Sequence, residues 1–123
     1  MDDTVTRIAE LKQMVRQFSE ERDWDQFHKA KDLAIGIVTE ASELLETFRF
    51  KSEQEVEDMF KDGTQMKSIR DELADIFYFA LRLAQKYDID VSKSLDEKIK
   101  DNAKKYPIEK VKGSNKKYTE LEH

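Results

Sequence analysis

Apolar residues recur every three or four positions along most of this chain, which is the period of one face of an α-helix. Stretches with this period predict four main helices, at residues 4–22, 31–48, 64–87 and 91–106. The connections between them are short, and short connections join helices that run antiparallel. The pattern therefore predicts an all-α protein built as an antiparallel four-helix bundle.

Local signals predict one more short helix and a polar tail. Ser52 and Glu55 have the S-x-x-E spacing of a capping box, which begins a helix. Gly63 is suited to end that helix, because glycine readily adopts the left-handed conformation found after a last helical turn. The chain beyond Pro107 is polar, so we expect it to be extended or partly mobile. The predicted organisation is a helical domain and a basic tail, at residues 1–107 and 108–123.

The third main helix carries a segment that is apolar on every side, residues 76–81. A four-helix monomer has too little interior to bury all of it, and a large exposed apolar patch usually marks an interface. Soluble oligomers are mostly symmetric assemblies of one chain. We therefore expect a homo-oligomer, either a dimer or a tetramer.

Composition agrees with one helical domain and excludes several other classes. The 123 residues include 3 Gly, 1 Pro and 38% hydrophobic residues, which suits a single domain of helices. The absence of cysteine excludes disulfides and thiolate metal sites. No apolar run reaches the ~20 residues of a membrane span, and the N-terminus lacks the layout of a signal peptide. We expect a soluble, cytoplasmic protein with no membrane partner.

Charge is unevenly distributed along the chain. A net charge of −5 argues against a nucleic-acid polymer as the partner. Residues 98–117, however, contain eight lysines and only two acids. A basic segment combined with an acidic centre suits a polyphosphate ligand, although a solvated, lysine-rich helix end has the same pattern.

Two pairs of acids lie inside the most apolar runs of the chain: Glu40 with Glu43, and Glu72 with Asp75. Each pair has the i, i+3 spacing that places both side chains on one helical face. Carboxylates at the margin of a core raise one another's pKa or require a cation. All-oxygen ligation suits Mg²⁺ or Mn²⁺, and these ions commonly hold phosphate oxygens in enzymes. In a chain with 40% charged residues, acids at this spacing can instead be solvated or salt-bridged.

A short stretch without helical period, residues 23–28, contains Trp24, Phe27 and His28. Trp24 is the only tryptophan and His28 is the only internal histidine. Beside an acidic helix, this indole and this imidazole can stack on and hydrogen-bond to a planar ligand such as a nucleotide base. Alternatively, Trp24 and Phe27 plug the end of the bundle and His28 caps a helix. We favour this structural role for Phe27 and leave both roles open for Trp24 and His28.

The acid pairs resemble the E-x-x-E…E-x-x-D signature of MazG-type all-α nucleoside triphosphate pyrophosphohydrolases. Four further segments are similar to the dCTP pyrophosphatase branch of that family, at residues 21–28, 71–75, 102–107 and 117–121. They span nearly the whole chain, and the R-D-W-x-Q-F-H block is the most specific of them. The resemblance implies a Mg²⁺-dependent hydrolase, with Mn²⁺ as a substitute. Its reaction would convert a nucleoside triphosphate into the monophosphate and pyrophosphate, as nucleotide-pool housekeeping.

The resemblance also implies roles for individual residues. The metal ligands, which would also orient or deprotonate the attacking water, are Glu40, Glu43, Glu72 and Asp75. The base and sugar pocket would be lined by Trp24, Asp25, Gln26, Phe27 and His28. The phosphates would be contacted from the last helix by Lys98, Asn102 and Lys105. The implied site combines an acidic metal centre, an aromatic pocket and a basic helix.

Two aromatic positions of the implied pocket, Phe50 and Phe79, depart from similar proteins that act on dCTP. Those proteins have Trp in place of Phe50 and Tyr in place of Phe79, so the aromatic faces are kept and a hydrogen-bonding atom is lost. The choice among dCTP, a modified pyrimidine nucleotide and other triphosphates is therefore open, as is the preference for deoxyribose. The alternative to the enzyme is a non-enzymatic helical interaction module with salt-bridged acids.

The last residues of the chain also read as the beginning of an expression tag, at residues 121–123. His123 is therefore excluded from the candidate site. Because residues 117–121 belong to the family resemblance, we expect native sequence to reach at least Glu120.

Overall fold

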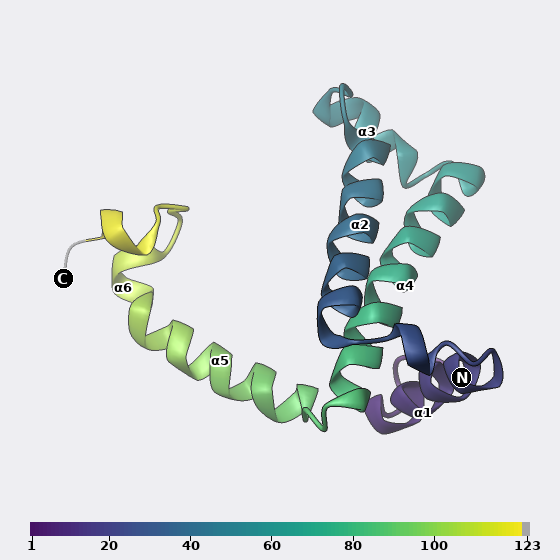
Figure 1. Cartoon of the computed structure of the whole chain (residues 1–123). Coiled ribbons are helices and arrows are strands. Elements are labelled where there is room, and N and C mark those ends of the chain that lie inside the picture. Colours follow the sequence, from purple (N-terminus) through teal and green to yellow (C-terminus); the bar gives the residue numbers. More distant parts are fainter. Residues whose placement is uncertain (122–123) are drawn as a thin grey trace. The chain divides into compact units, whose positions relative to one another are not determined.

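The computed structural model describes residues 1–121, which fold into helices joined by short connections (Figure 1). No strand occurs among these residues, so the predicted all-α class is confirmed. The expected tag residues 122 and 123 lie outside the described part. The elements, with η for a single turn of 3-10 helix, are α1 (Ile8–Glu21), η1 (Asp25–Phe27), α2 (Ala30–Phe48), α3 (Glu53–Met59), α4 (Gly63–Lys86), α5 (Val91–Lys105), α6 (Ile108–Val111) and η2 (Tyr118–Glu120).

The four predicted main helices are confirmed as α1, α2, α4 and α5. The first begins later than expected, at Ile8 rather than at residue 4. Asp2 explains the delay, because its Oδ1 accepts hydrogen bonds from the amide of Thr4 at 2.9 Å and from its hydroxyl at 2.6 Å. A side chain that binds nearby backbone in this way offers the chain an alternative to a helical turn.

Capping residues determine where the shorter helices begin. At α3, Ser52 Oγ accepts from the Glu55 amide at 3.1 Å and Glu55 Oε1 accepts from the Ser52 amide at 3.2 Å, so the predicted capping box is confirmed. The prediction that Gly63 ends this helix is wrong, because Gly63 is the first residue of α4. The Asp62 carboxylate explains the difference: it caps α4 by accepting from the Gln65 amide at 2.9 Å.

The chain divides into two compact units, Met1–Ile89 and a second unit that begins at Asp90. In the first unit α4 packs against α2 and α1, and α2 and α4 lie side by side (Figure 1). The apolar side chains buried in this unit are Leu33, Met59, Ile69, Leu81 and Ala84. The second unit contains α5, α6 and η2. The domain boundary expected at residue 107 stays a prediction.

The segment after Pro107 contains more helix than predicted. Pro107 directly precedes α6, where its missing N–H costs no hydrogen bond. The rings of Tyr106 and Tyr118 pack edge to face with centroids 6.1 Å apart, and Leu121 is buried. The expectation of an extended tail is therefore wrong for α6 and η2. The contacts of Tyr118 and Leu121 stabilise this part of the chain.

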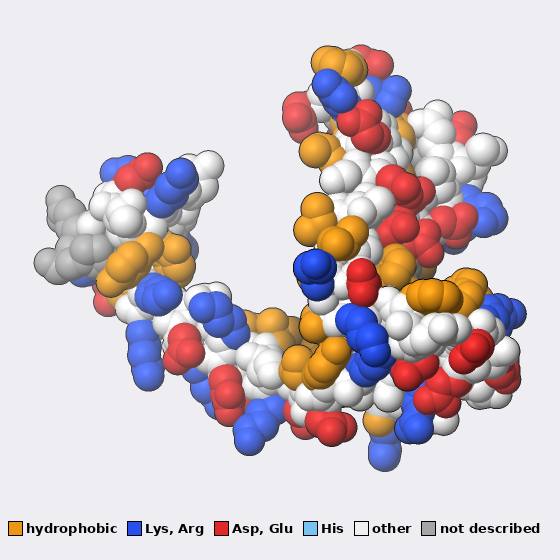
Figure 2. Space-filling view, viewed as in Figure 1, with side chains coloured by type: hydrophobic (Ala, Val, Ile, Leu, Met, Phe, Trp, Pro, Cys, Tyr) orange, Lys and Arg blue, Asp and Glu red, His pale blue; other side chains and the backbone are white. Residues whose placement is uncertain are grey.

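Both units leave large apolar side chains on their surfaces (Figure 2). On α2, Val38 and Leu45 are each 65% exposed. Phe77, inside the all-apolar segment of α4, is also exposed, as are Leu95 and Ile99 on α5. None of the helices within residues 1–121 is both long enough and apolar enough to cross a membrane. Exposed apolar surface of this extent is typical of a face that contacts another protein.

Candidate active site

Three carboxylates come together where α2 packs against α4. Glu40 and Glu43 lie one turn apart on α2, and Glu72 reaches them from α4. One oxygen of each carboxylate lies within 4.8 Å of the others. Acidic side chains, drawn in red, gather over these two helices in Figure 2. Helix packing thus joins acids from two distant parts of the sequence.

Asp75, the fourth predicted acid, lies beside this cluster. It follows Glu72 by three residues on α4 and lines the same cavity as Glu40. Asp75 is exposed, whereas Glu40 and Glu72 are half-buried. These four residues are called the acid group below: Glu40, Glu43, Glu72 and Asp75.

Burial and mutual repulsion disfavour the charged form of the acid group. Glu40 Oε2 and Glu72 Oε2 are buried and have no hydrogen-bond partner among the described residues. Burial raises the pKa of Glu40 to about 7, with further contributions from a hydrogen bond with Glu43 and from the neighbouring negative charges. Burial, followed by the hydrogen bond and charge of Glu43, also raises the pKa of Glu72. The acid group therefore holds extra protons near neutral pH unless a cation replaces them.

The composition of the acid group fits a hard divalent cation. Its donors are carboxylate oxygens, which are the ligands that Mg²⁺ and Mn²⁺ prefer. A cation would give the two unpartnered oxygens the contact they lack, and its charge would offset the repulsion among the acids. The geometry is thus suitable for binding one or more metal ions.

A cavity of about 470 Å³ opens beside the acid group in the first unit. Its walls come from α1, the loop after α1, α2 and α4, and they are formed by Met14, Val15, Phe18, Trp24, Glu40, Asp75, Tyr78 and Phe79. Aromatic and aliphatic side chains thus adjoin two acids. Such a pocket suits a flat aromatic group attached to a part of the ligand that binds metal.

Specific contacts hold the aromatic side chains of the cavity wall. The Phe18 ring meets the Trp24 ring edge to face, with centroids 5.7 Å apart, and the Tyr78 ring at 5.9 Å. The Tyr78 hydroxyl is hydrogen-bonded to the hydroxyl of buried Ser19 at 2.6 Å. The polar atom of this tyrosine is therefore engaged within the fold. Phe18 and Tyr78 were not predicted as cavity residues, because both fit the apolar period of their helices.

The two aromatic positions that depart from the family pattern have different surroundings. Phe79 belongs to the cavity wall and packs closely on α2 at Gly36, where an added Cβ would lie 2.5 Å from the ring. Phe50 is 91% exposed, has a left-handed φ of 64°, and lies under the Arg49 guanidinium at 4.5 Å. The structure thus places Phe79 at the cavity and Phe50 on the surface of the chain.

The members of the Trp24–His28 block also have separate environments. Trp24 lines the cavity, whereas the Gln26 amide donates to the Asp23 carbonyl oxygen at 3.0 Å and to Asp23 Oδ2 at 3.1 Å. Phe27 is 62% exposed. The interpretation of Phe27 as a plug for the bundle is therefore wrong, because the single turn η1 leaves its ring on the surface.

A buried cation that sequence analysis missed contacts the rest of the block. Arg82 of α4 is fully buried, with Nη2 2.5 Å from Asp25 Oδ1 and Nε donating to His28 Nδ1 at 3.2 Å. His28 is buried too, and it is the C-cap of the single turn η1, with its amide donating to the Asp25 carbonyl oxygen, while Lys29 is the N-cap of α2. The available signal was an arginine between two leucines, Leu81 and Leu83.

The three candidates for phosphate contacts lie on α5 in the second unit. Lys98, Asn102 and Lys105 are spaced so that they share one helical face. The two lysines are exposed and Asn102 is half-buried. Their assignment to phosphate binding stays a prediction.

Known proteins share both the fold and the region that holds the acid group. The MazG-like family matches residues 35–121, which include all four acids. The dCTP pyrophosphatase 1 of Rattus norvegicus is 30% identical over 114 residues, which are 93% of this chain and 67% of that protein. The dCTP pyrophosphatase 1 of Homo sapiens is 29% identical over 116 residues, or 94% and 68% of the two chains. A solved pyrophosphatase from Archaeoglobus fulgidus DSM 4304 has a TM-score of 0.76 at 28% identity, covering 87% of this chain and 98% of that chain.

The helical fold, the acid group and these relatives together define an all-α pyrophosphatase, an enzyme rather than an interaction module. The chain belongs to the MazG-like family. The predicted resemblance to the dCTP pyrophosphatases is confirmed, and the predicted enzyme class, the nucleoside triphosphate pyrophosphohydrolases, is confirmed with it.

Proposed function

We propose that this chain, with a bound divalent cation, hydrolyses a nucleoside triphosphate to the monophosphate and pyrophosphate at the cavity of its first unit. The observation that carries the proposal is a pair of buried, unpartnered carboxylate oxygens, on Glu40 and Glu72, beside an aromatic cavity. Mg²⁺, or Mn²⁺ in its place, would be held by Glu40, Glu43, Glu72 and Asp75. When bound, the ion neutralises phosphate charge and makes a bound water more acidic.

The fold holds the carboxylates of the acid group in position. Glu40 and Glu72 are half-buried on two packed helices, so the fold fixes their carboxylates before any ligand arrives. Asp75 lies at the exposed side and lines the cavity with Glu40. A carboxylate of this set orients the attacking water or accepts its proton, which is the role of a general base.

The aromatic wall of the cavity would receive the base. Trp24 and Phe79 offer aromatic side chains on which a base can stack. The hydroxyl of Tyr78 is hydrogen-bonded to Ser19, so this residue offers mainly its ring to a ligand. The relatives named dCTP pyrophosphatase 1 favour dCTP, or a modified pyrimidine nucleotide, as the first substrate to examine. Because the wall is predominantly apolar, we expect the enzyme to discriminate only weakly among bases.

Three residues of α5 are proposed phosphate contacts, and a second copy of the chain is the proposed partner. Lys98, Asn102 and Lys105 share one face that suits phosphate oxygens. Exposed apolar side chains on α2, α4 and α5 support a homo-oligomer, a dimer or a tetramer, in which copies cover these faces. The expected place of the enzyme is the cytoplasm, where it would remove unwanted or modified nucleotides.

Product analysis tests the proposed reaction. The protein is incubated with Mg²⁺ and each ribo- and deoxynucleoside triphosphate in turn, and the products are separated by ion-exchange chromatography. Monophosphate with pyrophosphate from one or more substrates supports the proposal. Diphosphate with orthophosphate contradicts the reaction, and no turnover with any substrate contradicts the proposed substrate class. Glu43→Gln, which keeps the shape and removes the charge, is the matched control and should lose turnover.

A further inference from the structure

A cluster of ion pairs and hydrogen bonds joins the loop after α1 to helix α4. This Arg82 cluster consists of Arg82 and Lys86 on α4 with Asp25 and His28 on the loop. Arg82 Nη2 is 2.5 Å from Asp25 Oδ1, Nε is 3.2 Å from His28 Nδ1, and Nη1 donates to Gln85. All three guanidinium nitrogens are therefore engaged, which accounts for an arginine that is wholly buried.

Lys86 adds a second set of contacts to the same loop. Its Nζ donates to the main-chain oxygens of Asp25, at 2.9 Å, and of His28, and it lies 3.3 Å from Asp25 Oδ1. Hydrogen bonding to Lys86, together with the charges of Lys86 and Arg82, holds the pKa of Asp25 below its usual range. Asp25 thus stays ionised, and both ends of the turn η1 are attached to α4.

The contact with Arg82 also determines the state of His28. A guanidinium keeps its protons and can only donate, so His28 Nδ1 must accept. The ring is therefore neutral, with its hydrogen on Nε2. Burial, followed by the charges of Arg82 and Lys86, lowers the pKa of His28 and keeps it in this state. The Arg82 cluster thus contains two cations, one anion and one neutral ring in a single arrangement.

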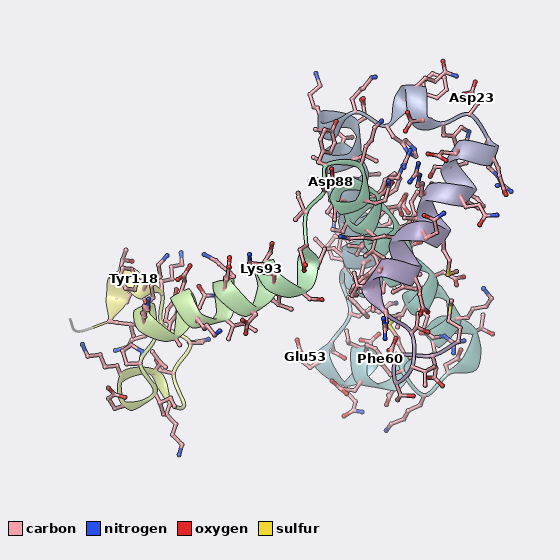
Figure 3. The ribbon with its side chains drawn as sticks, turned by 90° about the horizontal axis from the view of Figure 1, so that it is seen from below. Asp23, Glu53, Phe60, Asp88, Lys93 and Tyr118 are labelled. Atoms are coloured by element: carbon pink, nitrogen blue, oxygen red, sulfur yellow. The ribbon has the colours of Figure 1, made fainter. Side chains whose placement is uncertain are left out.

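The loop that is held in this way carries Trp24. Asp23, labelled in Figure 3, has a left-handed φ of 54°, so the chain changes direction just before Trp24. The Trp24 ring contacts Phe18 edge to face and lies 6.3 Å from the His28 ring, centroid to centroid. It is nevertheless 40% exposed. Its position at the cavity therefore depends on the backbone of the loop as well as on packing.

We propose that Arg82 is a positioning residue for substrate binding: through Asp25 and His28 it holds Trp24 in the cavity wall. The inference rests on the proposed function for the identity of the ligand, a nucleotide whose base stacks on Trp24. Arg82 is fully buried behind the loop, so it acts without touching the substrate. Loss of the Arg82 cluster should release Trp24 and weaken base binding, while the acid group stays in place on α2 and α4.

Fluorescence and kinetics of the full chain test this role. Trp24 is the only tryptophan, so acrylamide quenching reports on this position alone. Asp25→Asn removes the charge that faces Arg82, and Arg82→Lys keeps the cation but loses the planar fork. Both variants should raise the quenching constant and increase KM roughly fivefold, with kcat within about twofold, as expected when uniform binding is lost.

The matched control is Glu20→Gln, in the last turn of α1 just before the loop. This variant removes the acid of an exposed ion pair with Arg16. It should leave quenching and KM unchanged. Far-UV circular dichroism checks folding, and if Arg82→Lys fails to fold, Asp25→Asn decides. Unchanged quenching in folded Asp25→Asn, or altered quenching with unaltered KM, overturns the positioning role. A wild-type chain that turns over no nucleotide overturns the proposed function instead, and quenching still decides whether Arg82 holds Trp24.

Discussion

The acid group and the Arg82 cluster both depend on helix α4, but their buried charges have opposite surroundings. In the acid group two buried carboxylate oxygens have no partner, and burial raises the pKa of Glu40 to about 7. In the Arg82 cluster every guanidinium nitrogen has a partner, and hydrogen bonding to Lys86 lowers the pKa of Asp25. A fully paired buried charge maintains the fold, whereas unpartnered carboxylates are available to a ligand.

The acid group and the Arg82 cluster should respond in opposite ways to the loss of one charge. In the acid group, a neutral side chain should relieve repulsion and stabilise the metal-free protein at the expense of activity, the usual conflict at a functional site. In the Arg82 cluster, a neutral side chain at position 82 should leave buried His28 Nδ1 without its donor, which destabilises the fold.

The largest expected effect is on activity. Glu43→Gln and Asp75→Asn should each lower kcat/KM at least ~100-fold, because each removes a carboxylate of the proposed metal-binding set. The melting temperature of the metal-free variants should not fall, and their helicity should be intact by circular dichroism. Retained turnover in both variants would contradict a catalytic role for the acid group.

The second effect is on stability. Arg82→Met should lower the free energy of unfolding by about 2–4 kcal/mol, because it leaves buried His28 Nδ1 and the side-chain oxygen of Gln85 without their donor, whereas exposed Asp25 keeps its pair with Lys86. Urea denaturation measures the change. The control is Lys67→Met, which breaks an exposed pair with Asp71 and should cost at most ~1 kcal/mol. Equal losses in the two variants would mean that burial does not distinguish the Arg82 cluster.

A smaller effect tests the aromatic wall next to the acid group. Gly36→Ala should destabilise the chain by about 1–3 kcal/mol, because the new methyl group would overlap the Phe79 ring. Thermal melts measure this change. The double variant Gly36→Ala with Phe79→Leu should recover part of the loss, and a loss that is unaffected by position 79 would contradict the close contact.

The smallest effect is on the pH dependence of stability. The pKa of Glu40 rises from its ordinary value of 4.5 to about 7, mainly through burial, so the folded state binds more protons than the unfolded state between these values. The stability of the metal-free protein should therefore fall as pH rises from 5 to about 8. Melting curves of the wild type and of Glu40→Gln isolate the contribution of this group. The stabilisation by added Mg²⁺ should grow over the same range, and a pH-independent difference between the two proteins would argue against the shifted pKa.

Helical period was sufficient to predict α1, α2, α4 and α5, because each helix keeps a regular apolar stripe. The i, i+3 spacing showed that each acid pair shares a face, but only the packing of α2 on α4 brings Glu43 to Glu72. The end of the short helix was mispredicted because a strong N-cap at Asp62 outweighs the tendency of Gly63 to stop a helix.

The Arg82 cluster could not be predicted from local pattern. An arginine between Leu81 and Leu83 reads as a solvated position on an apolar helix, and its burial depends on Asp25 in a loop far away in the sequence. The exposure of Phe27 has a similar origin, because the orientation of a short loop follows from what its backbone binds. Lys86 binds the backbone on both sides of Phe27 and fixes that orientation.

The close contact between Gly36 and Phe79 also limits how the family can diversify. A side chain at position 36 requires the ring at position 79 to move or to be smaller, so we expect these two positions to vary together among related chains. A lineage that keeps glycine at position 36 is free to exchange one aromatic residue for another at position 79. Substitution at position 79, where we propose that the base stacks, should therefore be easier in chains that keep glycine at position 36 than in the others.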